Sequence, residues 1–197
     1  QHCRGIYDKF VSVLADYSEY VQQHQEAITN ILEATEKIAD EMPVGQEYDE
    51  VWAINGMGAI LRNYDKLFHM DDLDHCHFEI DPEMPVITSS MKEGLNTELY
   101  PIDEHYQKLG RLYLNNTVAY AICYAILKEV KEINLFGCDF VTHQGVDAKI
   151  TDSGASCCEY WLREAENAGM LVNVANTSRL LGHDTDGALY GYAEQPI

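Results

Sequence analysis

Short apolar runs alternate with longer helical patterns from residue 49 onward. The runs are rich in Val, Ile, Leu and Phe, which is typical of buried strands. They predict strands at residues 50–55, 66–71, 85–90, 133–136 and 170–174, with a short one near residue 99. Helices are predicted over residues 117–130 and from residue 153 or 156 to residue 168, and residues 96–114 are otherwise irregular. This alternation favours an α/β domain over residues 49–197, with a mainly parallel sheet and flanking helices.

The stretch Lys-Glu-Ile-Asn-Leu-Phe-Gly-Cys-Asp-Phe at residues 131–140 follows directly on the helix predicted before it. A helix that leads into a strand is half of a βαβ unit. The apolar content of residues 133–136 predicts a central strand that is buried on both faces. Ligands of open α/β sheets bind beyond the carboxyl ends of the strands. There, Gly137 lets a ligand or another backbone approach closely, and Asp139 supplies a carboxylate.

The first 42 residues carry a different pattern. Apolar or tolerated residues recur at alternating intervals of four and three over roughly four heptads. They are Phe10, Leu14, Tyr17, Val21, His24, Ile28, Ile31, Thr35 and Ile38. The pattern predicts one long helix or a helical hairpin as a separate N-terminal element, residues 1–42. It packs either on the sheet of its own chain or on the same helix of a second subunit, and the second alternative predicts a homo-oligomer.

The chain is strongly acidic. It has 33 acidic and 13 basic residues, a formal charge of −20 with histidine neutral. This charge argues against binding of nucleic-acid backbone over a broad surface. It is compatible with a small basic pocket for a nucleotide. The acidic surface serves solubility, or it mimics nucleic acid and binds a basic protein partner.

The apolar runs and the cysteines of the sequence bear on membrane contact and redox state. No apolar run reaches the length of a transmembrane helix and no signal peptide opens the sequence, so we expect no membrane contact and a cytoplasmic location. The six cysteines include no Cys-x-x-Cys pair and no disulfide-framework spacing. We therefore expect reduced thiols that behave as small buried hydrophobic residues.

Small and polar residues follow the predicted strands and would meet along one edge of the sheet. They are Asn55, Gly56, Asp71, Asp72, Thr88, Ser89, Ser90, Gly137, Asp139 and Ser178. The sequence Gly56-Met-Gly58 either cradles a phosphate with backbone amides or forms a turn. Asp71 and Asp72 either bind a divalent cation beside a diphosphate or act as a cap and a solvated loop. Asn116 contacts a ligand at a helix N-terminus, caps that helix, or does both.

Histidines supply the remaining candidates. A local cluster has the composition of a metal site: His69, Asp74, His75, Cys76 and His77. Zinc sites draw a second ligand pair from elsewhere in the chain, for which only His143 and His183 are available, so we assign no metal. His105 and His143 are candidate general bases. The sequence contains no Gly-x-Ser-x-Gly elbow, P-loop or His-Glu-x-x-His motif.

Three stretches together resemble a known family. Residues 50–71 fit a pattern Val-Trp-x-x-Asn followed by Asp-x-x-Phe-x-x-Asp, and residues 116–140 fit a helix followed by Ile-x-Leu-x-Gly-x-Asp-Phe. Residues 156–181 and Tyr190-Gly-Tyr192 fit its C-terminal pattern. The chain resembles a group of bacteriophage Rossmann-like proteins similar to the sialyltransferase-like and pterin-pyrophosphokinase-like glycosyltransferases. Such folds open with a strand and a Gly-x-Gly-Pro-Ser-like turn, and no such turn precedes Val51.

The resemblance implies a glycosyltransferase-like protein of the host-cell cytoplasm that binds a nucleotide or nucleotide sugar at the carboxyl edge of a Rossmann-like sheet. It implies that Asp71 and Asp139 contact the sugar or a metal ion and that Asn55 and Ser89 hold ribose or phosphate. His143 is the candidate base. The alternative is a non-catalytic interaction protein, in which the acidic surface and the N-terminal helix bind a host factor or build an oligomer.

Overall fold

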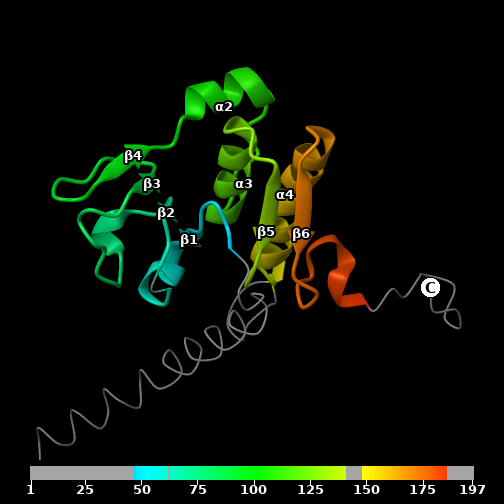
Figure 1. Ribbon diagram of the computed structural model, residues 1–197, viewed down its shortest axis with the longest axis horizontal. Coiled ribbons are helices and arrows are strands. Elements are labelled where there is room, and N and C mark those ends of the chain that lie inside the picture. The colour runs from blue at the N-terminus through cyan, green and yellow to red at the C-terminus, as the bar shows by residue number, and fades with distance from the viewer. Residues whose placement is uncertain (1–46, 62, 141–147, 186–197) are drawn as a thin grey trace, which may run out of the picture. The chain divides into compact units, whose positions relative to one another are not determined.

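The computed structural model describes residues 47–61, 63–140 and 148–185, all within the compact unit Pro43–Ile197. The predicted N-terminal helix, His143 and residues 186–197 lie outside the described residues. The described chain is a mixed α/β fold (Figure 1). Among its helices, none is long and apolar enough to cross a membrane.

Four short strands form a parallel sheet in the order of the sequence. They are β1 (Trp52–Ile54), β2 (Lys66–His69), β3 (Val86–Thr88) and β4 (Thr97–Leu99). The register joins Ile54 to Phe68 and Phe68 to Ile87. All four strands were predicted: the apolar runs of β1, β2 and β3 suit a sheet that is covered on both faces, whereas β4, which was expected near Leu99, is a more exposed strand.

The prediction that residues 133–136 form a central strand buried on both faces is wrong. Strand β5 (Glu132–Leu135) belongs to a separate two-stranded parallel sheet, where it pairs with β6 (Leu171–Val174). Its residues are exposed or half-buried. Ile133 and Leu135 pack against the core, whereas Asn173 donates hydrogen bonds to Glu132 and Asn134 at 2.9 and 3.0 Å. The strand alternates polar and apolar residues, so only one face joins the core.

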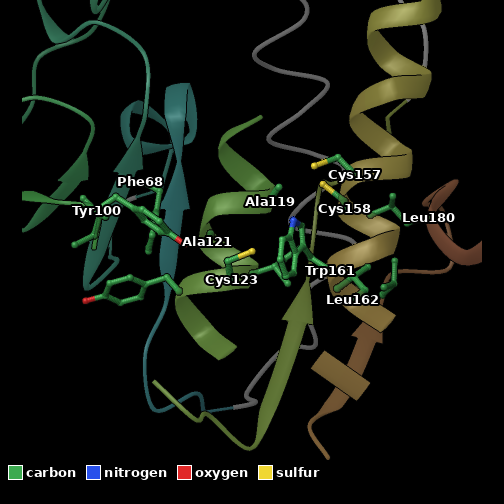
Figure 2. Packing of buried hydrophobic residues seen from close by; sticks show 14 residues of the cluster. Phe68, Tyr100, Ala119, Ala121, Cys123, Cys157, Cys158, Trp161, Leu162 and Leu180 are labelled. Atoms are coloured by element: carbon green, nitrogen blue, oxygen red, sulfur yellow. The ribbon is translucent and has the colours of Figure 1, made fainter. Parts of the chain in front are cut away.

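Helix α3 (Thr117–Leu127) is the centre of the main core. It is apolar around its whole circumference, which is typical of a helix buried on all sides. Figure 2 shows α3 between the four-stranded sheet and helix α4 (Ala148–Asn167). The sheet supplies Phe68 and Ile87 to this cluster, and α4 supplies Trp161 and Leu162.

The other face of the four-stranded sheet has a smaller core. Ala53, Leu67 and Val86 pack there against Leu73 and Ile80. These last two residues belong to the segment that joins β2 to β3, together with the 3₁₀ helix η2 (Leu73–His75). The segment of residues 73–84 therefore covers this face of the sheet, and we call it the cover segment.

The expectation that residues 96–114 are irregular is wrong, because they contain helix α2 (Ile102–Leu109). Its start and end signals are present in the sequence. Pro101 precedes it, Asp103 and Glu104 lie in its first turn, and Gly110 ends it at φ +69°, a left-handed conformation that favours glycine. Helix α4 also starts earlier than predicted, so Ser153 and Ser156 lie inside it and do not cap it.

Candidate functional site

Three polar residues stand level with one another at the carboxyl ends of adjacent strands. His69 ends β2, Thr88 ends β3, and the register pairs them directly. Asn55 follows Ile54 at the end of β1, one step beyond the pairing of Ile54 with Phe68. We call Asn55, His69 and Thr88 the polar row.

Each residue of the polar row has a buried polar atom without a hydrogen-bond partner in the described part of the chain. The atoms are Oδ1 of Asn55, Nδ1 of His69 and Oγ1 of Thr88. Thr88 is fully buried, and His69 is 7% exposed. Buried polar atoms are almost always paired, and an unpaired one costs about 1–3 kcal/mol. Three of them side by side at the carboxyl edge of a parallel sheet therefore mark this edge as the candidate ligand site.

Side-chain alternation explains why this row is buried. Residues two apart on a strand point to the same face, so His69 and Thr88 share the face of Leu67 and Val86. That face is closed by the cover segment, and the Phe78 ring lies edge-on to His69 with centroids 5.9 Å apart. Burial lowers the pKa of His69, and the charge of Asp71 opposes this in part. His69 is therefore neutral at pH 7.

The sequence placed Thr88, Ser89 and Ser90 together, and the structure separates them. Ser89 and Ser90 are exposed, and the Ser89 hydroxyl donates to the Met70 carbonyl at 3.1 Å.

Asn55 was predicted as a ligand contact, and it adopts φ +48°, a left-handed conformation. Gly56 lies in the 3₁₀ helix η1 (Asn55–Ala59), and a Cβ atom there would meet nothing within 4 Å. The turn alternative for Gly56 thus fits its surroundings.

Asp71 and Asp72 lie exposed just beyond β2. Asp72 caps η2, because its carboxylate accepts a hydrogen bond from the Asp74 amide at 2.9 Å, and it also contacts His75 at 3.1 Å. The cap alternative is therefore observed for Asp72. Asp71 lies two residues after His69, and its negative charge acts on the His69 imidazole. No group of three or more His, Cys, Asp and Glu among the described residues has the geometry of a metal site.

Asn116 is a helix cap and a link between helices. Its Oδ1 accepts from the Ala119 amide at 3.0 Å, which satisfies the start of α3. Its Nδ2 donates to the Gly154 carbonyl of α4 at 3.2 Å. A Cβ atom on Gly154 would lie 2.9 Å from the Phe140 ring, so the glycine lets α4 pack closely against Phe140. The capping alternative for Asn116 is observed.

Gly137 and Asp139 follow β5, Ser178 follows β6, and hydrogen bonds join the two loops that contain these residues. The Ser178 hydroxyl donates to the Cys138 carbonyl at 2.6 Å and accepts from the Leu180 amide at 3.1 Å. The carbonyl of Asp139 accepts from the Arg179 amide at 3.3 Å. Gly137 adopts φ +66°, which favours glycine. Asp139 is half-buried, and its predicted role in ligand binding stays a prediction.

His105 is a structural residue, and its candidacy as a general base is not supported by its surroundings. It is fully buried, with Nδ1 2.7 Å from the Tyr100 hydroxyl and Nε2 2.6 Å from the Arg111 carbonyl. A carbonyl only accepts, so Nε2 carries the proton and Nδ1 accepts from the tyrosine. Both nitrogens of the neutral imidazole are therefore engaged in hydrogen bonds.

Acid should destabilise the fold through the two buried histidines. Burial lowers the pKa of both His69 and His105 below the ordinary value of 6.5. Below pH 6.5 the unfolded chain gains protons that the folded chain does not, so stability falls as the pH falls from 6.5 toward the folded pKa values. We expect melting temperatures to drop over this window. His69→Gln and His105→Gln should each flatten the drop, whereas equal slopes in all three proteins would contradict the assignment.

The described chain also has an open hollow of about 440 Å³ on α4 and on the 3₁₀ helix η3 (Leu180–Thr185). It is lined by Ser156, Glu159, Tyr160, Arg163 and Leu181. Its charged groups already have partners. Arg163 contacts Glu166 at 2.7 Å, and Glu159 accepts from the Leu181 amide at 2.9 Å.

Five cysteines are described, and they are present as thiols: Cys76, Cys123, Cys138, Cys157 and Cys158. Burial raises the pKa of Cys123, Cys157 and Cys158, so these thiols stay protonated and unreactive at neutral pH.

No protein-family model, curated protein or solved structure matches this chain. The functional argument therefore depends on the geometry of the carboxyl edge and on the class that the fold defines, an α/β protein with a parallel sheet.

Proposed function

We propose that this chain is a Rossmann-like, glycosyltransferase-like protein that binds a nucleotide or nucleotide sugar at the carboxyl edge of β1–β3. The polar row of Asn55, His69 and Thr88 carries the proposal. Three buried polar atoms without partners cost stability, and a ligand that pairs with them removes that cost. The carboxyl edge of a parallel sheet is also the usual place for such a ligand.

The remaining roles follow the sequence resemblance. Ser89 would contact ribose or phosphate, and Asn55 would contact the ligand as a member of the polar row. Asp71 lies exposed beyond β2, where it would contact the sugar or a divalent ion held jointly with the ligand's phosphates. Asp139, which follows β5 in the chain, and His143 would act on the sugar. Self-association through the N-terminal helix stays a prediction.

A thermal-shift titration with uridine, cytidine, adenosine and guanosine diphosphates and their glucose conjugates tests this function. A ligand at about one hundred times its Kd stabilises the native state by about 2.7 kcal/mol. We expect at least one nucleotide to raise the melting temperature. Asn55→Gly should weaken this shift, because it removes Oδ1 while a glycine keeps the backbone at φ +48°.

Asn167→Gly is the matched control. Asn167 is exposed and ends α4, which leads into the amino end of β6, so it lies away from the carboxyl edge. This variant should bind as the wild type does. Absence of any shift across the whole nucleotide panel would reject the proposal.

The net charge of −20 supports a second function, that of a non-catalytic acidic interaction protein. Its binding to a basic partner would weaken steeply with salt, because exposed charges are screened. Salt-sensitive binding to a polylysine peptide, together with a nucleotide panel that gives no shift, would favour this second function.

A further inference from the structure

We propose that the polar row takes the uncharged, hydrogen-bonding edge of a nucleobase, and that the phosphates of the ligand lie outside it. This inference rests on the proposed function and names the part of the nucleotide that Asn55, His69 and Thr88 recognise.

The row offers neutral donors and acceptors. Oδ1 of Asn55 accepts, Oγ1 of Thr88 donates and accepts, and Nδ1 of a neutral His69 does one or the other according to its tautomer. A nucleobase edge carries donors and acceptors side by side and no charge. Its pairing with the row would satisfy both partners without burying an ion, which is costly unless the ion is paired.

The charges around the row disfavour a phosphate. The residues that follow β2 are acidic, and the negative charge of Asp71 acts on His69. Asp72 and Asp74 come next along the chain. The ammonium group of Lys92, which lies beyond β3, is already paired with Asp74. A phosphate placed in the row would therefore meet uncharged groups and the negative charge of Asp71, and it would find no free cation in Lys92, so its charge would be repelled.

The dimensions of the row suit a flat group. Neighbouring strands lie about 4.8 Å apart, so two adjacent members of the row can reach one planar edge. The walls beside them are apolar and aromatic: Met57, Tyr64 and Phe78 pack on the same face of the sheet. Because the polar atoms are buried beneath this layer, the ligand reaches them only when the cover segment, residues 73–84, moves outward.

Calorimetric titrations with the four nucleosides, their 5′-diphosphates and inorganic pyrophosphate separate the base from the phosphates. We expect one nucleoside to bind with most of the affinity of its diphosphate and pyrophosphate not to compete with it. Thr88→Val removes one hydrogen bond to the base and should weaken nucleoside binding by about 3- to 10-fold. The same variant should melt at or above the wild-type temperature, because it removes a buried hydroxyl that has no partner among the described residues.

Thr97→Val is the matched control on β4. The Thr97 hydroxyl accepts a hydrogen bond from the Lys92 amide at 3.2 Å and lies outside the row. This variant should melt at a lower temperature than the wild type and bind the nucleoside unchanged. A diphosphate that binds while its nucleoside does not, or that binds Thr88→Val as tightly as wild type, would overturn the inference and leave the proposed function intact. Failure of every nucleoside and nucleotide to bind would overturn both.

Discussion

Replacing Trp161 with alanine should lower the free energy of unfolding by about 3–5 kcal/mol, the range for large aromatic residues removed from a core. Trp161 is 1% exposed and lies between α3 and α4 (Figure 2). Its ring packs edge-on against His105, with centroids 5.2 Å apart. Its indole nitrogen donates to the Tyr113 carbonyl at 2.5 Å. The substitution therefore removes both a large packed volume and a buried hydrogen bond.

Urea denaturation followed by circular dichroism measures this loss. Trp161→Phe is the control, since it keeps most of the ring volume and removes the hydrogen bond. It should cost about 1–2 kcal/mol, because the Tyr113 carbonyl still accepts from the Cys157 thiol at 3.1 Å. Equal stabilities of the alanine variant and the wild type would show that this packing contributes nothing.

Replacing His105 with phenylalanine should cost about 2–4 kcal/mol, because the buried Tyr100 hydroxyl and the partly buried Arg111 carbonyl lose their partner together. The Tyr100 hydroxyl and the Arg111 carbonyl both depend on the imidazole. Tyr100 is 5% exposed, so water reaches its hydroxyl poorly. Phenylalanine fills much of the same space, and the loss therefore reports hydrogen bonding more than packing.

A double-mutant cycle with Tyr100→Phe assigns this cost. The double variant has no tyrosine hydroxyl to leave unpaired, so it should be less destabilised than the sum of the two single variants. Additive costs would mean that the Tyr100–His105 hydrogen bond contributes nothing to stability. Denaturant midpoints of the four proteins, measured at a pH above 7, keep the histidine neutral throughout.

The strands and the central helix could be predicted from the sequence because local pattern decides them. Short runs of Val, Ile, Leu and Phe suit strands covered on both faces, and β1, β2 and β3 formed where those runs lie. The helix that begins after Asn116 is apolar on all sides, and such a helix is stable in the protein interior. The signals for α2 were equally local, and the helix was missed because Pro101 and Gly110 were not read as its start and end.

The sequence placed Asn55 and Thr88 at the carboxyl edge, but it grouped them with residues that the structure leaves exposed, and it did not include His69. Thr88 and its neighbours Ser89 and Ser90 have similar chemistry, and only the register buries Thr88 and leaves the other two in solvent. His69 was grouped with His75 and His77 because they are close in sequence. The sheet instead turns His69 inward, while His75 and His77 remain exposed.

Sequence alone thus determined the class of the fold and the edge where its polar residues gather, since hydrophobic periodicity and capping act over a few neighbouring residues. Tertiary structure decided which polar residues lose water. Burial depends on strand pairing and on the cover segment, which folds back and brings the Phe78 ring against His69. Tertiary structure also decided that β5 joins β6 in a second sheet. Glu132 and Asn134 face water and the Asn173 amide on one side of β5, whereas Ile133 and Leu135 face the core on the other side.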